Sequence, residues 1–301
     1  MSAELKRLLQ DSLGERAKFD QPMSVHTTWG VGGPAWCVCQ VASQEEAALV
    51  IKATRQAGLP WMPLGRGSNL LVSDAGYPGV MLRLAGELAS LRRQGDCLWA
   101  GGGAHLPAAV KFAARLGLAG LEWAAGIPGT VGGAVATNAG ALDSDMSRLT
   151  RGITLLLAEG ETARLEGAQL PAGYRQRSLP RESLVLAALL ALQEDRPEAV
   201  GLRCDQALAR RRRSQPTGAA SAGSVFKNPP GDYAGRLIEA AGCKGLTVGG
   251  AQVSAKHANF IVNRGGATAR DVLALMREVR QRVLKSSGVE LEPEVEVVGH
   301  A

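Results

Sequence analysis

The sequence predicts an α+β fold built from three units, and three observations lead to that prediction. Segments with helical spacing and segments typical of strands are mixed along the chain, without an internal repeat. The 301 residues are enough for two or three domains with substantial cores. Glycine-rich loops lie in the first two units. The expected units are 1–85, 86–197 and 198–301, with the last strand, in 289–301, able to return to the first unit.

The first unit begins with a short amphipathic helix, because leucines within 5–13 recur at helical spacing. Ser43 and Glu46 form a capping-box pattern that opens a second helix, and Gly58 ends it. The remaining expected elements are strands at 36–41, 61–64, 70–73 and 79–84. Together they resemble a βαβ unit whose 65–69 loop directly follows a strand.

The second and third units each mix strands with helices. In the second we expect strands at 88–93 and 97–101, a helix at 106–116, a hairpin of 153–158 with 162–165, and a buried strand at 184–192. In the third we expect helices at 197–213 and 233–241, and strands at 225–226, near 246–253, at 259–262 and at 294–298. Thr268 and Asp271 cap a further helix there, whose apolar residues share one face.

Composition narrows the class of protein. Hydrophobic residues at 46% and charged residues at 21% are globular values and disfavour disorder. A net charge of +6 favours anionic ligands, among them a nucleotide sugar, a dinucleotide or a nucleic acid. The basic run 210–213 is explained equally well by a solvated helix end and by a contact with a diphosphate.

Five scattered cysteines without a CxxC pair indicate reduced thiols, and the isolated histidines predict no metal site. The N-terminus lacks an apolar core of signal-peptide length, so we expect a cytoplasmic protein.

The stretch 126–141 carries five glycines and no charged side chain. Glycine lets a ligand reach the backbone, and exposed N–H groups can bind phosphate without a cationic side chain. The alternative is a tight segment whose glycines serve packing alone. A membrane helix is disfavoured by the glycines, Pro128 and Asn138. The second loop, 65–69, favours one long phosphate-containing cofactor. The expected cofactor-binding residues are Gly65, Arg66, Gly67, Ser68, Asn69, Gly126, Ile127, Pro128, Gly129, Thr130, Gly132, Gly133, Ala134, Thr137, Asn138, Gly140 and Ala141.

Neither loop has the GxGxxG pattern of dinucleotide-binding folds or the GxxxxGK[ST] pattern of P-loop enzymes. Both loops, however, resemble those of the UDP-N-acetylenolpyruvoylglucosamine reductase (MurB) family of flavoenzymes. Further similar blocks are HTTWGVGGPA at 26–35, AGSVFKNP at 222–229, VSAKHANFIVN at 253–263 and GVELEPEVEVVG at 288–299. The resemblance implies two FAD-binding subdomains of the vanillyl-alcohol-oxidase/PCMH type and a C-terminal α+β substrate domain.

The resemblance also implies an activity in peptidoglycan synthesis. FAD would take hydride from NADPH and pass it to the enolpyruvyl group of UDP-N-acetylglucosamine enolpyruvate, both substrates using one site in turn. A monomer that binds neither nucleic acid nor membrane is expected. The spacing between Arg175 and the next strand leaves no room for the inserted tyrosine-bearing segment of some members, so the chain resembles the short form.

Three catalytic residues follow from the resemblance. Ser224 matches the proton donor, Arg175 the arginine that holds the substrate carboxylate, and Glu294 the glutamate near the reacting double bond. On sequence alone, Ser224 is better explained as a turn serine, and the resemblance reverses that preference. The alternative for Arg175 is a surface arginine, and the alternative for Glu294 is an exposed acidic strand face. The family usually has serine where this chain has Arg177.

A serine is a poor general acid without help, so nearby Lys227, or charges from other segments, would have to lower its pKa. The expected substrate-binding residues are Lys227, Asn228, Tyr233, Arg236 and Lys256. Two rival functions remain open at this point: another flavin oxidoreductase on the same scaffold, and a basic nucleic-acid binder, which the low aromatic content disfavours.

Overall fold

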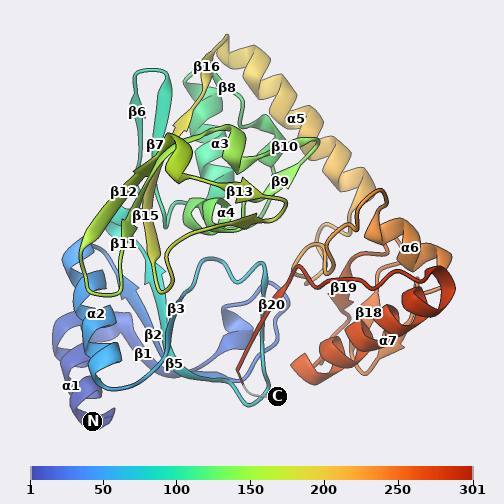
Figure 1. The fold of residues 1–301 in the computed structure, drawn as a ribbon, viewed down its shortest axis with the longest axis horizontal. Helices are drawn as coiled ribbons and strands as arrows, with labels where there is room; N and C mark the ends of the chain where they lie inside the picture. The colour runs from blue at the N-terminus through green and yellow to red at the C-terminus, as the bar shows by residue number, and fades with distance from the viewer. Residues whose placement is uncertain (1, 300–301) are drawn as a thin grey trace. The chain divides into compact units, whose positions relative to one another are not determined.

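The computed structural model describes residues 2–299, whose contacts divide into two compact units (Figure 1). Unit 1 comprises residues up to 19 together with 37–65 and 79–210. Unit 2 comprises 20–36, 66–78 and 211 onward. Each unit is therefore assembled from separate parts of the chain. The three-unit division expected from the sequence stays a prediction.

Unit 1 contains two sheets. One has the strand order β1-β2-β5-β3, formed by β1 (Ala17–Pro22), β2 (Pro34–Val41), β5 (Tyr77–Leu84) and β3 (Trp61–Pro63), with β3 parallel to β5. Helices α1 (Ser2–Leu13) and α2 (Gln44–Gln56) pack on each other beside it (Figure 1). The Ser43 hydroxyl accepts from the Glu46 amide, so the predicted helix cap is confirmed.

The other sheet of unit 1 is antiparallel, in the order β12-β11-β15-β7-β6. Its strands are β12 (Thr162–Glu166), β11 (Thr150–Leu156), β15 (Leu184–Ala191), β7 (Cys97–Gly101) and β6 (Leu91–Gln94). The apolar strand β15 lies at its centre, as its buried side chains require. The predicted hairpin and buried strand are confirmed, whereas the strand expected at 88–93 begins only at Leu91.

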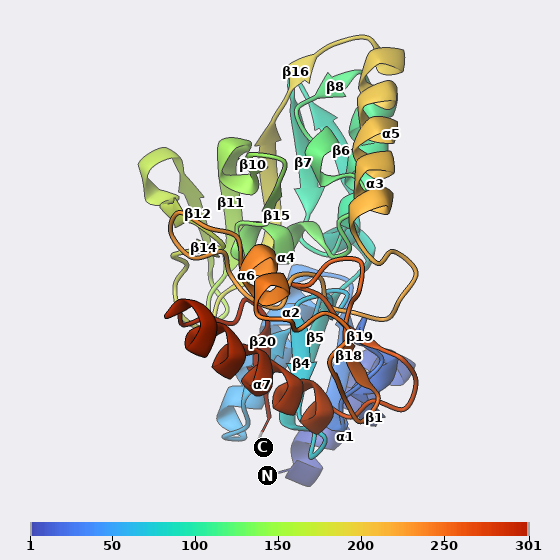
Figure 2. The same cartoon turned by 90° about the vertical axis from the view of Figure 1, so that its right-hand side faces the viewer.

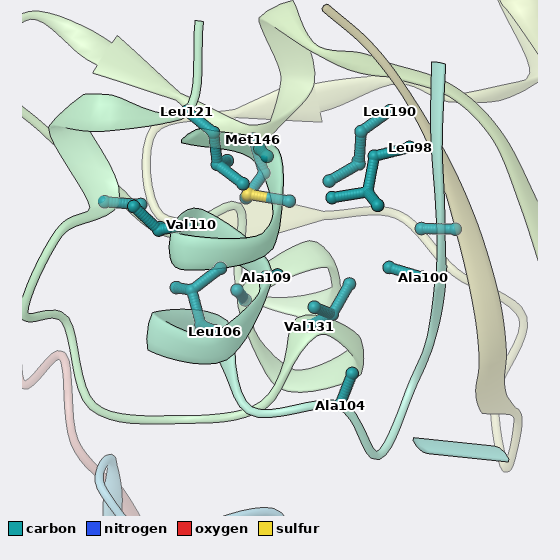
Figure 3. Close-up of a cluster of buried hydrophobic side chains, with 14 of the residues drawn as sticks. Leu98, Ala100, Ala104, Leu106, Ala109, Val110, Leu121, Val131, Met146 and Leu190 are labelled. Carbon is teal, nitrogen blue, oxygen red and sulfur yellow. The ribbon is translucent and has the colours of Figure 1, made fainter. Parts of the chain in front are cut away.

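The core of unit 1 lies between this sheet and two helices, α3 (Leu106–Arg115) and α4 (Val131–Ala136). Figure 3 shows Leu98 and Leu190, from β7 and β15, on one side of this core and Ala109, from α3, across from them. Val131 joins them from α4. Helix α5 (Pro197–Ser214) adds Val200 and Cys204. Short pairs β8 (Leu118–Ala119) with β16 (Gln193–Glu194), β9 (Gly140–Ala141) with β10 (Ser144–Asp145), and β13 (Ala172–Gly173) with β14 (Gln176–Arg177) complete the unit.

Unit 2 has its core around α6 (Ala234–Ala240), α7 (Ala269–Ser287) and an antiparallel sheet in the order β17-β18-β19. Its strands are β17 (Thr247–Val248), β18 (Ala251–Val253) and β19 (Ile261–Asn263). Helix α7 lies along this sheet (Figure 2). Thr268 and Asp271 form the predicted capping box, and the predicted apolar face of α7 is buried. Strand β20 (Glu296–Val298) pairs in parallel with β4 (Leu70–Val72).

Three sequence-based expectations for unit 2 are wrong. The segment 246–253 is not one strand but a hairpin of β17 (Thr247–Val248) and β18 (Ala251–Val253), because Gly249 turns the chain at a φ of 51°. Residues 225–226 form no strand, since Phe226 makes only an isolated bridge to Pro293. Finally, β20 begins at Glu296, so the expected acidic strand face that includes Glu294 is not formed.

None of the helices within residues 2–299 is both long and apolar enough to cross a membrane. Within the same residues, no group of three metal-binding side chains is close enough to hold an ion.

Candidate active site

The glycine-rich stretch is not a loop throughout, because residues 131–136 form helix α4, with Thr130 as its N-cap. Its glycines have different tasks. Gly126 and Gly129 adopt φ angles of 77° and 142°, which favour glycine. A Cβ on Gly132 would lie 2.9 Å from the carbonyl oxygen of Gly102, the residue directly after β7, so that glycine serves packing against the neighbouring backbone. The packing interpretation is therefore correct for part of the stretch.

Gly133 differs from these glycines because no close packing contact requires a glycine at this position. It is exposed, and a Cβ there would meet only Thr130 Oγ1, at an ordinary 3.5 Å. Nearby, the amides of Gly129 and Thr130 enter no backbone hydrogen bond among the described residues. Donors beside an exposed glycine fit the phosphates of a dinucleotide cofactor. This part of the stretch therefore suits FAD chemically, whereas Gly132 supports the fold.

Asn138 was expected to bind the cofactor, but its side chain is occupied within the protein. It is only 2% exposed, it donates to the Gly173 carbonyl oxygen over 2.9 Å, and its Oδ1 accepts from the Ser147 amide over 2.8 Å. Asn138 thus fastens the β13–β14 hairpin to the glycine-rich stretch. Thr137 is exposed, and its hydroxyl donates to the Gly133 carbonyl oxygen.

The loop at 65–69 is fixed by contacts of its glycines. A Cβ on Gly65 would lie 2.9 Å from Thr130 Oγ1, and one on Gly67 would lie 2.3 Å from the His26 carbonyl oxygen. Neither position accepts a larger residue without rearrangement. Arg66 is exposed, and Asn69 donates its side-chain amide to the Glu294 carbonyl oxygen over 3.1 Å.

Arg175 lies in the two-residue turn between β13 and β14. Its φ is 56°, a left-handed backbone conformation that costs a non-glycine residue about 1 kcal/mol or more. Its guanidinium donates to the Gly140 carbonyl oxygen over 2.7 Å and lies over the Tyr174 ring. A Cβ on Gly140 would approach this guanidinium to 2.8 Å, so the glycine makes room for it. The strained arginine is thus docked on the glycine-rich stretch.

Arg177, which stands where the family usually has serine, is 8% exposed and faces the protein interior. Its Nε donates to the Val135 carbonyl oxygen at the end of α4, and Nη1 donates to the Leu170 carbonyl oxygen. Burial lowers the pKa of its guanidinium, and the charge of Asp145 opposes that shift. Arg177 therefore ties the hairpin that carries Arg175 to helix α4.

Ser224 lies between Gly223, with a φ of 77°, and a segment that is bonded on both sides. On one side, the Val225 amide donates to the Asn259 carbonyl oxygen over 2.9 Å. On the other, the Glu294 amide donates to the Val225 carbonyl oxygen over 2.8 Å. The backbone next to Ser224 thus directly pairs with that of Glu294. The segments that carry Ser224 and Glu294, two residues that the sequence suggested only through the resemblance, are therefore paired in unit 2.

Lys227, the expected helper of Ser224, forms an ion pair with Glu292 at the protein surface. Its charge is therefore balanced by the Glu292 carboxylate. Asn228 Oδ1 accepts from the Ala234 amide, which fixes the start of α6.

The remaining expected substrate ligands are exposed. Tyr233 is 70% exposed, and Arg236 forms an ion pair with Asp232 that holds the pKa of this carboxyl at about 2. Lys256 donates to the Arg212 carbonyl oxygen in the basic run. The run itself ends α5, where basic charge is favourable, as the helix-end interpretation expects.

Comparisons with known proteins now define the class. Residues 35–166 match the family described as FAD binding domain, and residues 215–298 match the UDP-N-acetylenolpyruvoylglucosamine reductase C-terminal domain. With the α+β architecture, these matches identify a flavin-binding oxidoreductase and confirm the predicted fold class. A 4-ethylphenol oxidase from Gulosibacter chungangensis shares the fold alone, with a TM-score of 0.51 and 15% identity over 97% of this chain and 64% of that one.

Closer relatives name the family. The chain is 48% identical over 281 residues to UDP-N-acetylenolpyruvoylglucosamine reductase of Heliobacterium modesticaldum, covering 93% of this chain and 90% of the relative. It is 45% identical over 301 residues to UDP-N-acetylenolpyruvoylglucosamine reductase 2 of Symbiobacterium thermophilum, covering 100% and 97%. The crystal structure of MurB from Thermus caldophilus matches with a TM-score of 0.81 and 41% identity, covering 93% and 97%. This chain belongs to the UDP-N-acetylenolpyruvoylglucosamine reductase family.

Proposed function

We propose that this protein reduces UDP-N-acetylglucosamine enolpyruvate to UDP-N-acetylmuramate, a step of peptidoglycan precursor synthesis. The pairing of the Glu294 amide with the Val225 carbonyl oxygen, next to Ser224, is the observation that carries this proposal. It brings the segments of the two expected proton-handling residues together at a site built by the family's own C-terminal domain. The near-complete coverage of the reductase from Heliobacterium modesticaldum supports the same reaction.

FAD bound at the glycine-rich stretch supplies hydride acceptance and hydride transfer. NADPH is the proposed reductant, and it becomes NADP⁺ when its hydride leaves. The enolpyruvyl double bond gains that hydride at one carbon and a proton at the other, so the reaction consumes one NADPH and one proton. The protein must therefore deliver the proton and stabilise the negative charge that develops on the enolpyruvyl group.

Ser224 is the proposed proton donor. Its hydroxyl O–H bond breaks as the new C–H bond forms, and solvent returns a proton to the serine oxygen. A hydroxyl is a weak acid, so this step depends on close placement of the serine oxygen at the accepting carbon. Glu294 lies on the segment paired with that of Ser224. It is the proposed carboxyl partner that orients the proton-donating group.

Arg175 is the proposed ligand of the substrate carboxylate. Its planar guanidinium can bind both carboxylate oxygens and stabilise the enolate, which lysine does less well. Its strained backbone is typical of residues held for function. Tyr233, Arg236 and Lys256 are exposed polar groups proposed to bind the nucleotide diphosphate, with Arg236 leaving Asp232 when the ligand arrives.

Several finer features belong to the proposal. The protein is a short-form member without the tyrosine-bearing insertion, because only the segment 176–183 separates Arg175 from β15. It uses NADPH, acts as a cytoplasmic monomer and contains the three expected domains 1–85, 86–197 and 198–301.

The test is a turnover assay with product analysis. Purified protein supplied with FAD, NADPH and UDP-N-acetylglucosamine enolpyruvate is expected to oxidise one NADPH per substrate and to form a product heavier by two hydrogen atoms. NADPH oxidation that proceeds equally without the enolpyruvyl substrate would contradict the proposal. Turnover of an alcohol or phenol with O₂ instead would favour an oxidase on the same scaffold.

A further inference from the structure

The side chain of Asn259 lies against the segment that follows Ser224. Its Oδ1 accepts from the Phe226 amide over 3.0 Å, and its Nδ2 donates to the Phe226 carbonyl oxygen over 2.8 Å. The Asn259 backbone carbonyl also accepts from the Val225 amide over 2.9 Å. One residue thus makes three hydrogen bonds with the two residues directly after Ser224.

Asn259 is itself rigidly held. It is 3% exposed, and its own amide donates to Nδ1 of His257 over 3.3 Å. The His257 ring packs edge-on against Phe260, and Asn259 therefore has little freedom to rotate. A buried carboxamide that bonds both the amide and the carbonyl oxygen of one residue fixes that residue's backbone in position and in orientation.

The segment after Ser224 has no regular secondary structure to hold it. Phe226 forms only an isolated bridge to Pro293, and Gly223 on the other side has a positive φ. The other bonds come from the 292–294 segment, through the Lys227 amide to the Glu292 carbonyl oxygen and the Glu294 amide to the Val225 carbonyl oxygen. Without the Asn259 side chain, the Phe226 amide and carbonyl oxygen would lose these two bonds, and only the main-chain bonds of Val225 and Lys227 would hold the segment after Ser224.

We propose that Asn259 is a positioning residue for Ser224, clamping the Phe226 backbone through its amide and its carbonyl oxygen so that the serine hydroxyl is held at the carbon that accepts its proton. This inference rests on the proposed function of Ser224. Because displacing a reacting group by about 1 Å can cost about 100-fold in rate, the clamp is expected to affect proton delivery far more than flavin reduction.

Two variants test the clamp. Asn259→Ala removes both side-chain hydrogen bonds, whereas Asn259→Asp keeps the acceptor for the Phe226 amide and loses the donor to its carbonyl. In both, reoxidation of the reduced flavin by the enolpyruvyl substrate is expected to slow, by about 10- to 100-fold for Asn259→Ala. Reduction of the flavin by NADPH is expected to keep its wild-type rate. Equal slowing of both half-reactions, or neither, would overturn the proposal.

A control separates positioning from general folding. Asn263 makes a similar clamp in the same unit, since its Nδ2 donates to the Trp29 carbonyl oxygen and its Oδ1 accepts from the Gly265 and Ala267 amides. Asn263→Ala is expected to lose comparable stability without selective slowing of reoxidation. If Asn263→Ala slows reoxidation as much as Asn259→Ala, the Asn259 effect is only structural and the proposal fails.

A readout without turnover and a double variant complete the test. Amide hydrogen exchange at Val225 and Phe226 is expected to accelerate in the Asn259 variants, and unchanged exchange would overturn the clamp.

In a Ser224→Ala background, Asn259→Ala is expected to cause no further slowing of reoxidation, because it acts through the serine. If the two substitutions together slow reoxidation by the product of their separate effects, Asn259 does not act through the serine. A wild-type protein that fails to turn over the enolpyruvyl substrate would instead refute the proposed function, while the exchange experiment would still judge the clamp.

Discussion

The side-chain amide of Asn69 donates to the main-chain carbonyl oxygen of Glu294, over 3.1 Å. The Glu296 amide in turn donates to the Asn69 carbonyl oxygen, at the start of the parallel pairing of β20 with β4. The last residue of the 65–69 loop is therefore bound to the segment that carries Glu294, the proposed carboxyl partner of Ser224. One asparagine of a predicted cofactor loop thus has a structural task inside unit 2.

Asn69→Ala is predicted to loosen the Glu294 segment. Loss of one half-buried hydrogen bond should lower the free energy of unfolding by about 1 kcal/mol. Because Glu294 would be held less firmly, reoxidation of the flavin by the enolpyruvyl substrate should also slow. Urea unfolding and stopped-flow absorbance measure the two effects, and a variant that loses stability with unchanged reoxidation would show that this bond does not serve Glu294.

Gly132 and Gly133 offer a matched pair of substitutions. Gly132→Ala is predicted to lower the free energy of unfolding by about 1–3 kcal/mol, because its Cβ would press on the Gly102 carbonyl oxygen. Gly133→Ala should leave the FAD-free protein as stable or more stable by up to about 1 kcal/mol, since alanine favours an exposed helix position.

The same pair tests the cofactor site. Gly133→Ala is predicted to weaken FAD binding, because the new methyl group would lie where the cofactor is proposed to approach the backbone. Calorimetric titration of FAD-free protein measures this. Wild-type FAD affinity in a correctly folded Gly133→Ala variant would mean that the cofactor does not approach this glycine.

Arg177→Met is predicted to destabilise unit 1 while keeping the side-chain stem. The carbonyl oxygens of Val135 and Leu170 would lose their donor, and a buried group left unpaired costs about 1–3 kcal/mol. The exposed Arg213→Met is the control and should change the free energy of unfolding by less than about 0.5 kcal/mol. Equal stability of the two variants in urea would show that the Arg177 contacts contribute nothing net.

The pH dependence of stability has a named contributor in unit 1. A bidentate hydrogen bond from Arg16, opposed by burial and assisted by the Ala42 amide, lowers the pKa of Glu46 to about 2. A depressed carboxyl pKa means that this stabilisation is fully present above the unfolded pKa of 4.5 and is lost as the pH falls towards 2.

Arg16→Gln should therefore be less stable than wild type at neutral pH, and the difference should shrink between pH 4.5 and 2. Thermal unfolding across this range measures it. The exposed pair Arg282–Glu278 is the control: Arg282→Gln should change stability little at any pH. A difference for Arg16→Gln that stays constant down to pH 2 would contradict the assignment to Glu46.

Elements defined by local chemistry could be predicted from the sequence. The caps at Ser43 and Thr268 depend on side chains three residues apart, so the sequence shows them directly. The apolar strand β15 was predictable for the same reason, because nearly all its residues need burial. The sequence does not indicate helix α4, because the glycines at 132 and 133 are unfavourable in helices. Close packing against Gly102, directly after β7, explains the first of them.

Features that depend on distant partners could not be predicted. The segment at Val225 resembles a strand, yet its bonds come from Asn259 and from the 292–294 segment, far along the chain. The roles of Asn138 and Arg177 likewise appear only once the β13–β14 hairpin lies on the glycine-rich stretch. The resemblance selected Ser224, Arg175 and Glu294, and it contained no information on what holds them.

We propose that one bound flavin passes hydride from NADPH to the enolpyruvyl nucleotide sugar. The most direct test is the visible absorption spectrum of the FAD-loaded protein under anaerobic conditions, first with NADPH and then with UDP-N-acetylglucosamine enolpyruvate. We predict that NADPH bleaches the flavin band and that the nucleotide sugar restores it. A flavin that NADPH bleaches but the nucleotide sugar leaves reduced would contradict the claim, as would a protein that binds no FAD.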